Sequence, residues 1–150
     1  MKEAIGNSMV FNFIIIFTSI FIVLMIGSLS YTKAFKVRNR IIDIIESHQG
    51  YNQEASDEID ENLRAIGYSM VDSSCGEHNG VSPMTNNSVY PYCIYEHSST
   101  DNVGGISIQK GKYYGVKVFI KIDIPLIGGF IKIPLYGETR VIIRKAEVEG

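Results

Sequence analysis

An uninterrupted apolar run near the start of the chain limits what the protein can fold into. Residues 9–29 (MVFNFIIIFTSIFIVLMIGSL) contain no charged side chain. As a helix, this run would be about 32 Å long, and the hydrocarbon core of a bilayer is about 30 Å thick. No small-x-small cleavage pattern follows the run, although a removed secretory signal would need one. The sequence therefore predicts a membrane-spanning helix that stays attached to the rest of the chain.

The residues after this run are enough for one compact domain with its own core, but hardly for two. We therefore expect a membrane anchor and a single head. The predicted parts are a short N-terminal tail or leader (1–8), a transmembrane helix (9–30) and a head (31–150) made of a helical stalk (31–67), a variable surface loop (68–105) and an antiparallel sheet (106–150).

Helical periodicity continues past the membrane. Val37, Ile41 and Ile45 recur on one helix face, and neither Pro nor Gly interrupts the pattern before Gly50. The pattern predicts one helix from near residue 8 to about residue 47. Its apolar stripe needs a partner, either the protein's own head or a neighbouring subunit.

A second, amphipathic helical segment is expected next. Its candidate cap residues are Asn52, Ser56 and Asp57. Apolar side chains then share one face, and Gly67 supplies a stop signal. The members of this face are Ala55, Ile59, Leu63 and Ile66.

Strand patterns dominate the C-terminal part. Residues 115–124 alternate between apolar and polar side chains, which predicts a half-buried strand, and a short strand is expected near residues 89–96. Pro125 and Pro134 indicate sheet edges or bulges. A last strand over 138–144 would place Thr139, Val141 and Ile143 on one face, and would complete an antiparallel sheet of three or four strands. The predicted class is α+β, with the sheet packed on the long helix.

Two stretches of the chain resemble a known family. Residues 6–25 (GNSMVFNFIIIFTSIFIVLM) and the ending VKVFIKIDIPLIGGFIKIPLYGETRVIIRK are similar to the TadE-like minor pseudopilins of tight-adherence pilus systems. The resemblance implies a pilin-like fold and a structural subunit of a cell-envelope pilus, secretion or DNA-transfer apparatus. It also implies membrane lipid, other pilin-like subunits and assembly proteins as partners.

Processing and assembly residues follow from the same resemblance. A prepilin peptidase of that family cuts after a Gly before the apolar run, which makes Gly6 the candidate cleavage site. Where the family carries a Glu near the fifth mature position, this chain has Phe11, followed by Asn12. Asn12 can hydrogen-bond across helices, and Gly27 allows helices to approach closely. The full set of candidate helix-assembly residues is Asn12, Gly27, Val37, Ile41 and Ile45.

The charges that flank the apolar run disagree with the pilin plan about orientation. Lys33, Lys36, Arg38 and Arg40 follow the run, and this bias alone would place the head in the cytoplasm. Pilin-like proteins carry the head outside. We expect an extracytoplasmic head, because large domains translocate regardless of flanking charge and because two cysteines suit an oxidising compartment.

Cys75 and Cys93 are the sharpest local feature of the predicted loop. A disulfide between them would close a loop of about 18 residues and stabilise the fold by about 3 kcal/mol in the chain-entropy estimate. The alternative is a zinc site formed by Cys75, His78, Cys93 and His97, and a third possibility is two free thiols. The zinc site would suit a different function, a solitary single-pass membrane-anchored binding or sensing module.

Catalysis finds little support in the sequence. Asp72, Ser73 and His78 lie close along the chain, but a catalytic triad is recognised by geometry and not by proximity in sequence. The formal net charge of −2 and the absence of a long basic block argue against a nucleic-acid surface. We expect a non-enzymatic protein without a cofactor.

Overall fold

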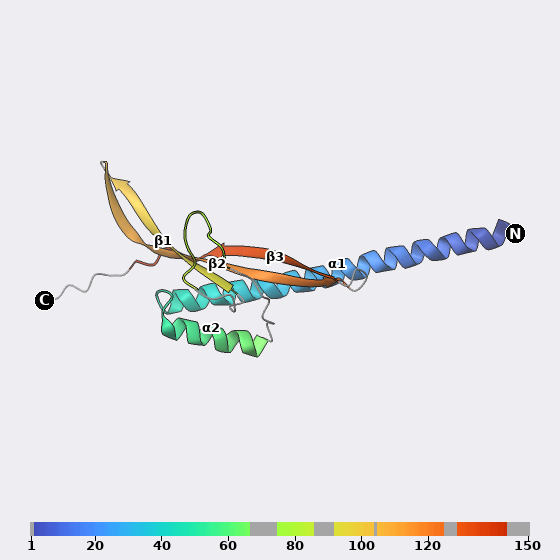
Figure 1. Ribbon diagram of the computed structural model, residues 1–150, viewed down its shortest axis with the longest axis horizontal. Helices are drawn as coiled ribbons and strands as arrows, with labels where there is room; N and C mark the ends of the chain where they lie inside the picture. The colour runs from blue at the N-terminus through green and yellow to red at the C-terminus, as the bar shows by residue number, and fades with distance from the viewer. Residues whose placement is uncertain (1, 67–74, 86–91, 104, 125–128, 144–150) are drawn as a thin grey trace.

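The computed structural model has an α+β fold, as the sequence predicts (Figure 1). Its elements are, in chain order, α1 (Lys2–Ser47), α2 (Gln53–Ile66), β1 (Tyr92–Val103), β2 (Ile106–Ile124) and β3 (Gly129–Glu138). The structure describes residues 2–66, 75–85, 92–103, 105–124 and 129–143.

Helix α1 is longer at its start than expected. Its 46 residues begin at Lys2, so residues 2–8, which the sequence predicts as a tail or leader, are helical. The helix ends at Ser47 as predicted. A turn follows in which Gln49 and Gly50 have positive φ angles and the Gly50 amide donates a hydrogen bond to the Ile45 carbonyl. This left-handed ending is the usual way to close a helix, and it sends the chain back along α1 (Figure 1).

Helix α2 begins at the predicted cap. The Ala55 amide donates a 2.8 Å hydrogen bond to Asn52 Oδ1, which satisfies one of the free donors in the first turn. Ala55, Ile59 and Leu63 are buried as expected. Ile66 is the exception, because it lies at the last residue of the helix and 40% of it is exposed.

The sheet has three antiparallel strands in the order β1–β2–β3. β1 and β2 pair from Tyr92 with Val118 to Val103 with Ile106. The predicted variable loop over 68–105 is therefore partly wrong, since its last third is a strand, and β2 begins at Ile106 instead of residue 115. The polar composition of this hairpin concealed it, because backbone ladder bonds do not depend on apolar side chains.

The predicted last strand over 138–144 is wrong within the described residues. β3 ends at Glu138, and beyond it only Ile142 forms a bridge, with Lys112. Thr139 is buried and Ile142 packs against the core, whereas Val141 and Ile143 are exposed, so the expected alternation does not continue past Thr139. The physical reason is the anchoring of Thr139, whose hydroxyl oxygen accepts a 2.9 Å hydrogen bond from the Tyr114 amide.

The core lies between α1, α2 and one face of the sheet. Val37, Ile41 and Ile45 are 0%, 1% and 0% exposed. The sheet contributes Tyr92, Ile94, Tyr114, Val116 and Val118. The protein's own head therefore covers this stripe, and the head is one of the two partners that the sequence left open.

Pro134 lies in β3, which is an edge strand of the described sheet, as the sequence predicts. Pro125 lies outside the described residues.

Candidate functional site

The first half of α1 is the largest exposed apolar surface of the described chain. Phe17 is 73% exposed, and none of the most apolar 18-residue stretch is buried. By length and composition this is the one described helix that could cross a membrane. The surface is compatible with a single-pass membrane anchor, and a signal sequence has the same features.

One face of this exposed half is less exposed than the rest. Among the described side chains of residues 8–33, only those on this face are partly covered: Ser19, Val23, Ile26, Gly27 and Ser30. Their spacing continues the helix face that carries Ala34, Val37 and Ile41 in the core. The face of α1 that packs on the sheet in the core therefore continues into the apolar run.

The three predicted residues of this region are placed as follows. Asn12 is exposed, and Gly6 lies inside α1. Gly27 lies on the partly covered face, where a Cβ atom would meet no described atom within 4 Å. The space beside Gly27 leaves room for a close approach, and its role in helix assembly stays a prediction.

Two hydroxyl side chains within the apolar run hydrogen-bond to the backbone of the same helix. The hydroxyl groups of Thr18 and Ser19 each donate a 2.8 Å hydrogen bond to the backbone carbonyl four residues earlier, at Ile14 and Ile15. Such bonds remove the need for water or for a partner chain. They make this helix suited to an apolar environment on all sides.

α1 and β3 meet where the apolar surface ends. Arg38 Nη1 donates a 3.1 Å hydrogen bond to the Tyr136 carbonyl, and its guanidinium lies 4.4 Å above the Phe35 ring. A Cβ atom at Gly137 would lie 2.8 Å from Arg38 Cδ, so any larger residue at this position would displace the Arg38 side chain. The adjoining cleft of about 370 Å³ carries both charge signs, from Arg38, Asp43, Glu46, Glu138 and Arg140.

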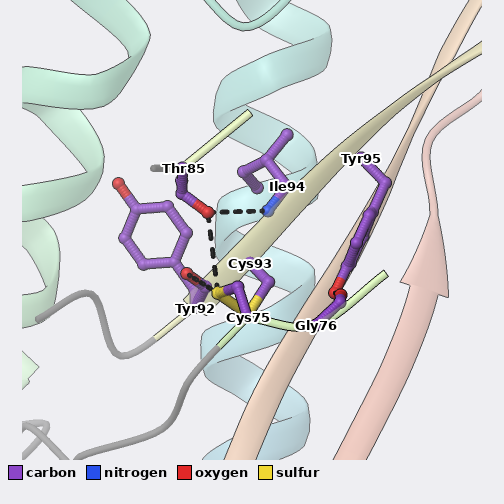
Figure 2. The surroundings of a disulfide bond; sticks show 7 residues. All are labelled: Cys75, Gly76, Thr85, Tyr92, Cys93, Ile94 and Tyr95. Carbon is purple, nitrogen blue, oxygen red and sulfur yellow. Dashed lines mark hydrogen bonds between the residues drawn. A yellow bond between two sulfur atoms is a disulfide. The ribbon is translucent and has the colours of Figure 1, made fainter. Parts of the chain in front are cut away.

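Cys75 and Cys93 form a disulfide, which confirms the predicted pairing (Figure 2). The zinc alternative is wrong, because both thiols are used in this bond and a zinc ion needs thiolates. Among the described residues, no three His, Cys, Asp or Glu side chains are grouped as metal ligands would be. His78 stacks at 4.3 Å from the Tyr136 ring, and His97 stacks at 4.9 Å from the Tyr113 ring.

The disulfide fastens residues 75–85 to β1. The Tyr95 hydroxyl donates a 2.7 Å hydrogen bond to the Gly76 carbonyl (Figure 2). The Met84 amide donates a 2.7 Å bond to the Ile94 carbonyl. The Ile94 amide in turn donates a 3.4 Å bond to Thr85 Oγ1. Because β1 is an edge strand, this segment covers backbone groups that would otherwise pair with another chain.

Four tyrosines of the head are buried or half-buried. Desolvation by burial is the main cause that raises their pKa, and the affected side chains are Tyr92, Tyr95, Tyr114 and Tyr136. The neighbouring carboxylate of Glu138 also raises the pKa of Tyr136. The abundance of tyrosine was visible in the sequence, but its burial was not.

A second cleft lies between the α1–α2 turn and the sheet. Its volume is about 330 Å³, and its lining includes Tyr51, Glu96, Lys112 and Tyr114. Lys112 Nζ lies 2.6 Å from Glu96 Oε1, and the Tyr114 hydroxyl donates a 3.3 Å hydrogen bond to Glu96 Oε2. The charges on its walls thus satisfy one another to a large extent.

The described residues do not assemble a catalytic triad from the candidates in the sequence. Asp72 and Ser73 lie outside the described residues, and the His78 ring lies between Tyr95 and Tyr136. Comparison of the chain with protein-family models, with curated proteins and with solved structures gave no match.

Proposed function

We propose that this protein is a structural, non-enzymatic subunit with a pilin-like plan, anchored in the cell membrane by the first half of α1. Its head lies outside the cytoplasm, and the subunit belongs to a pilus, secretion or DNA-transfer apparatus of the cell envelope. The observation that carries the proposal is the continuity of α1, which passes from a largely exposed apolar half into the core of the head.

Physical chemistry supports an apolar environment for the exposed half. Leaving one Phe side chain in water instead of burying it costs about 2 kcal/mol, and Phe13, Phe17 and Phe21 are all more than half exposed. Either lipid or neighbouring helices must cover them. The resemblance to TadE-like pseudopilins supports both at once, since such a helix inserts in the membrane before it packs against like helices.

The assembly surface is assigned to the side of α1 that faces away from the sheet. By helical spacing, Phe17, Phe21 and Leu24 lie on the side of α1 away from the partly covered face. The core stripe around Ile41 is already occupied, so it is not available to a neighbour. Asn12 remains a candidate for hydrogen bonds between helices nearer the N-terminus.

Oxidative crosslinking in the native membrane tests the proposal. Cys75 and Cys93 are bonded to each other, so a single new cysteine from Leu24→Cys would be the reactive thiol. Thr100→Cys, on the exposed end of the β1–β2 hairpin, is the matched control. A filament subunit crosslinks through position 24 to itself or to other subunits. If position 24 gave monomer alone, assembly through α1 would be refuted.

A solitary membrane-anchored binding module is the second candidate. The observation that favours it is the cleft of about 330 Å³ beside Tyr51 and Tyr114, which is large enough for a small ligand. Because Cys75 and Cys93 form a disulfide, zinc is not the ligand of such a module. A monomer-only result at position 24 would make this module the function to pursue.

A further inference from the structure

β3 runs in the same direction as α1, as three contacts show. Arg38 Nη1 hydrogen-bonds to the Tyr136 carbonyl, Gly137 packs against Arg38 and Ile42, and the Arg140 amide donates a 2.8 Å bond to Glu46 Oε1. Later residues of the strand therefore meet later residues of the helix. Earlier residues of β3 must lie nearer the N-terminus of α1.

The reach of the β2–β3 hairpin follows from standard geometry. From Tyr136 to Arg140 the extended chain advances about 13 Å, which matches about 12 Å of helix between Arg38 and Glu46. From Tyr136 back to Gly129 the strand covers about 23 Å, equal to about 15 residues of helix. The end of the hairpin is thus level with Val23, inside the apolar run.

Two observations agree with this position. Figure 1 shows the end of β2 and the start of β3 beside α1, on the side toward the N-terminus, while the β1–β2 hairpin points to the opposite end. The partly covered face of α1 also extends down to Ser19, although its neighbours at the same height are exposed. A covering element on the sheet side explains this pattern.

We propose that the end of the β2–β3 hairpin, residues 120–124 and 129–133, contacts the same lipid bilayer that α1 crosses. The inference rests on the proposed membrane anchoring of α1. The hairpin is then a second lipid contact, which holds the head in one orientation above the membrane surface.

The chemistry of this end fits lipid. Phe130 and Ile131 are apolar residues of β3, and Ile133, higher on the strand, is 42% exposed. Lys132 is exposed about level with Leu29, roughly 6 Å along the helix axis from exposed Lys33 on α1. Lysines on two elements near the end of the apolar run suit anionic headgroups at the membrane surface.

The depth of the contact is limited. Asp123 pairs with Phe130 across the hairpin, and a carboxylate is costly in hydrocarbon. Backbone groups on the outer edge of β3 would also lack partners there. The contact therefore involves the headgroup layer and the outermost acyl chains, not the centre of the bilayer.

Quenching by brominated lipid tests the inference on the full chain, reconstituted in phosphatidylcholine–phosphatidylglycerol vesicles with its disulfide intact. An environment-sensitive dye is attached to one new cysteine at a time: Phe130→Cys at the hairpin end, Leu24→Cys in α1 and Thr100→Cys at the opposite hairpin. Ile133→Cys replaces Phe130→Cys if the latter does not fold, since Ile133 is partly exposed.

The outcomes separate the two proposals. Brominated lipid is expected to reduce emission from positions 24 and 130 and to leave position 100 unchanged. Quenching at 24 without quenching at 130 would overturn the hairpin contact and leave the anchor intact. An absence of quenching at 24 would instead overturn the membrane anchoring on which the inference rests.

Discussion

The guanidinium of Arg38 donates a 3.1 Å hydrogen bond to the carbonyl of Tyr136, a residue 98 positions later in the chain. Stacking on Phe35 and hydrogen bonds to Asn39 hold the same guanidinium in place. This contact sets the height of β3 along α1. It thereby also sets how far the β2–β3 hairpin reaches toward the membrane.

Arg38→Ala is expected to destabilise the head by about 1–3 kcal/mol, because a charged hydrogen bond is lost and the Tyr136 carbonyl is left unpaired. Arg40→Ala is the matched control, since Arg40 makes an exposed 3.9 Å ion pair with Glu58 that is worth at most about 1 kcal/mol. Chemical denaturation of both variants in detergent measures the difference. Equal effects of the two substitutions would contradict the assigned role of Arg38.

Ile41→Asp is expected to unfold the head. Ile41 is buried between α1 and the sheet, and an unpaired carboxylate there costs several kcal/mol or takes up a proton. Ile143→Asp is the control, because Ile143 is 62% exposed and such surface changes stay within about 0.5 kcal/mol. Thermal unfolding followed by circular dichroism distinguishes them. A folded Ile41→Asp head with lost assembly would show that the stripe faces neighbouring subunits after all.

Removal of the disulfide by Cys75→Ser with Cys93→Ser is expected to cost about 3 kcal/mol in the chain-entropy estimate. Residues 75–85 should then leave the edge of β1, because the disulfide is their covalent link to that strand. Hydrogen exchange would rise at the Met84 and Ile94 amides and stay constant in α2, which serves as the internal reference. Unchanged protection at Ile94 would show that the hydrogen bonds hold the segment without the disulfide.

Stability is expected to fall as the pH rises above about 10, the ordinary pKa of tyrosine. Burial raises the pKa of Tyr92, Tyr95, Tyr114 and Tyr136 in the folded protein. The unfolded chain therefore loses these protons first, and the stabilisation is full below pH 10 and lost progressively above it.

Melting temperatures between pH 8 and pH 11 measure this alkaline loss. Tyr92→Phe should reduce the slope, since Phe has no proton to lose. Tyr31→Phe is the control, because Tyr31 is 52% exposed on α1. A slope that responds equally to both substitutions would contradict the assignment to buried tyrosines.

The intact mass of the protein from its native membrane tests processing at Gly6. A prepilin-type peptidase would remove residues 1–6, and the mature chain would begin at Asn7. A Gly6→Leu variant should keep its full length and accumulate outside the assembled fraction. A full-length native chain would refute processing and favour the solitary anchored module.

Local patterns were enough to predict several elements. The uncharged run and the unbroken periodicity after it predicted α1, whose end at Ser47 is confirmed. Asn52 marked the start of α2, and the alternation around Val116 and Val118 marked a half-buried strand. The two cysteines predicted the disulfide. Each of these features is encoded within a few neighbouring residues, which is why sequence alone reveals it.

Tertiary structure decided the rest. The polar hairpin formed by β1 and the first part of β2 exists because two strands pair through their backbones, which side-chain patterns do not report. The covering of the Val37–Ile45 stripe by the protein's own sheet, the burial of Ile142 and the stacking of His78 on Tyr136 all join residues far apart in the chain. The sequence determined which surfaces need a partner, and long-range packing decided which partner each surface received.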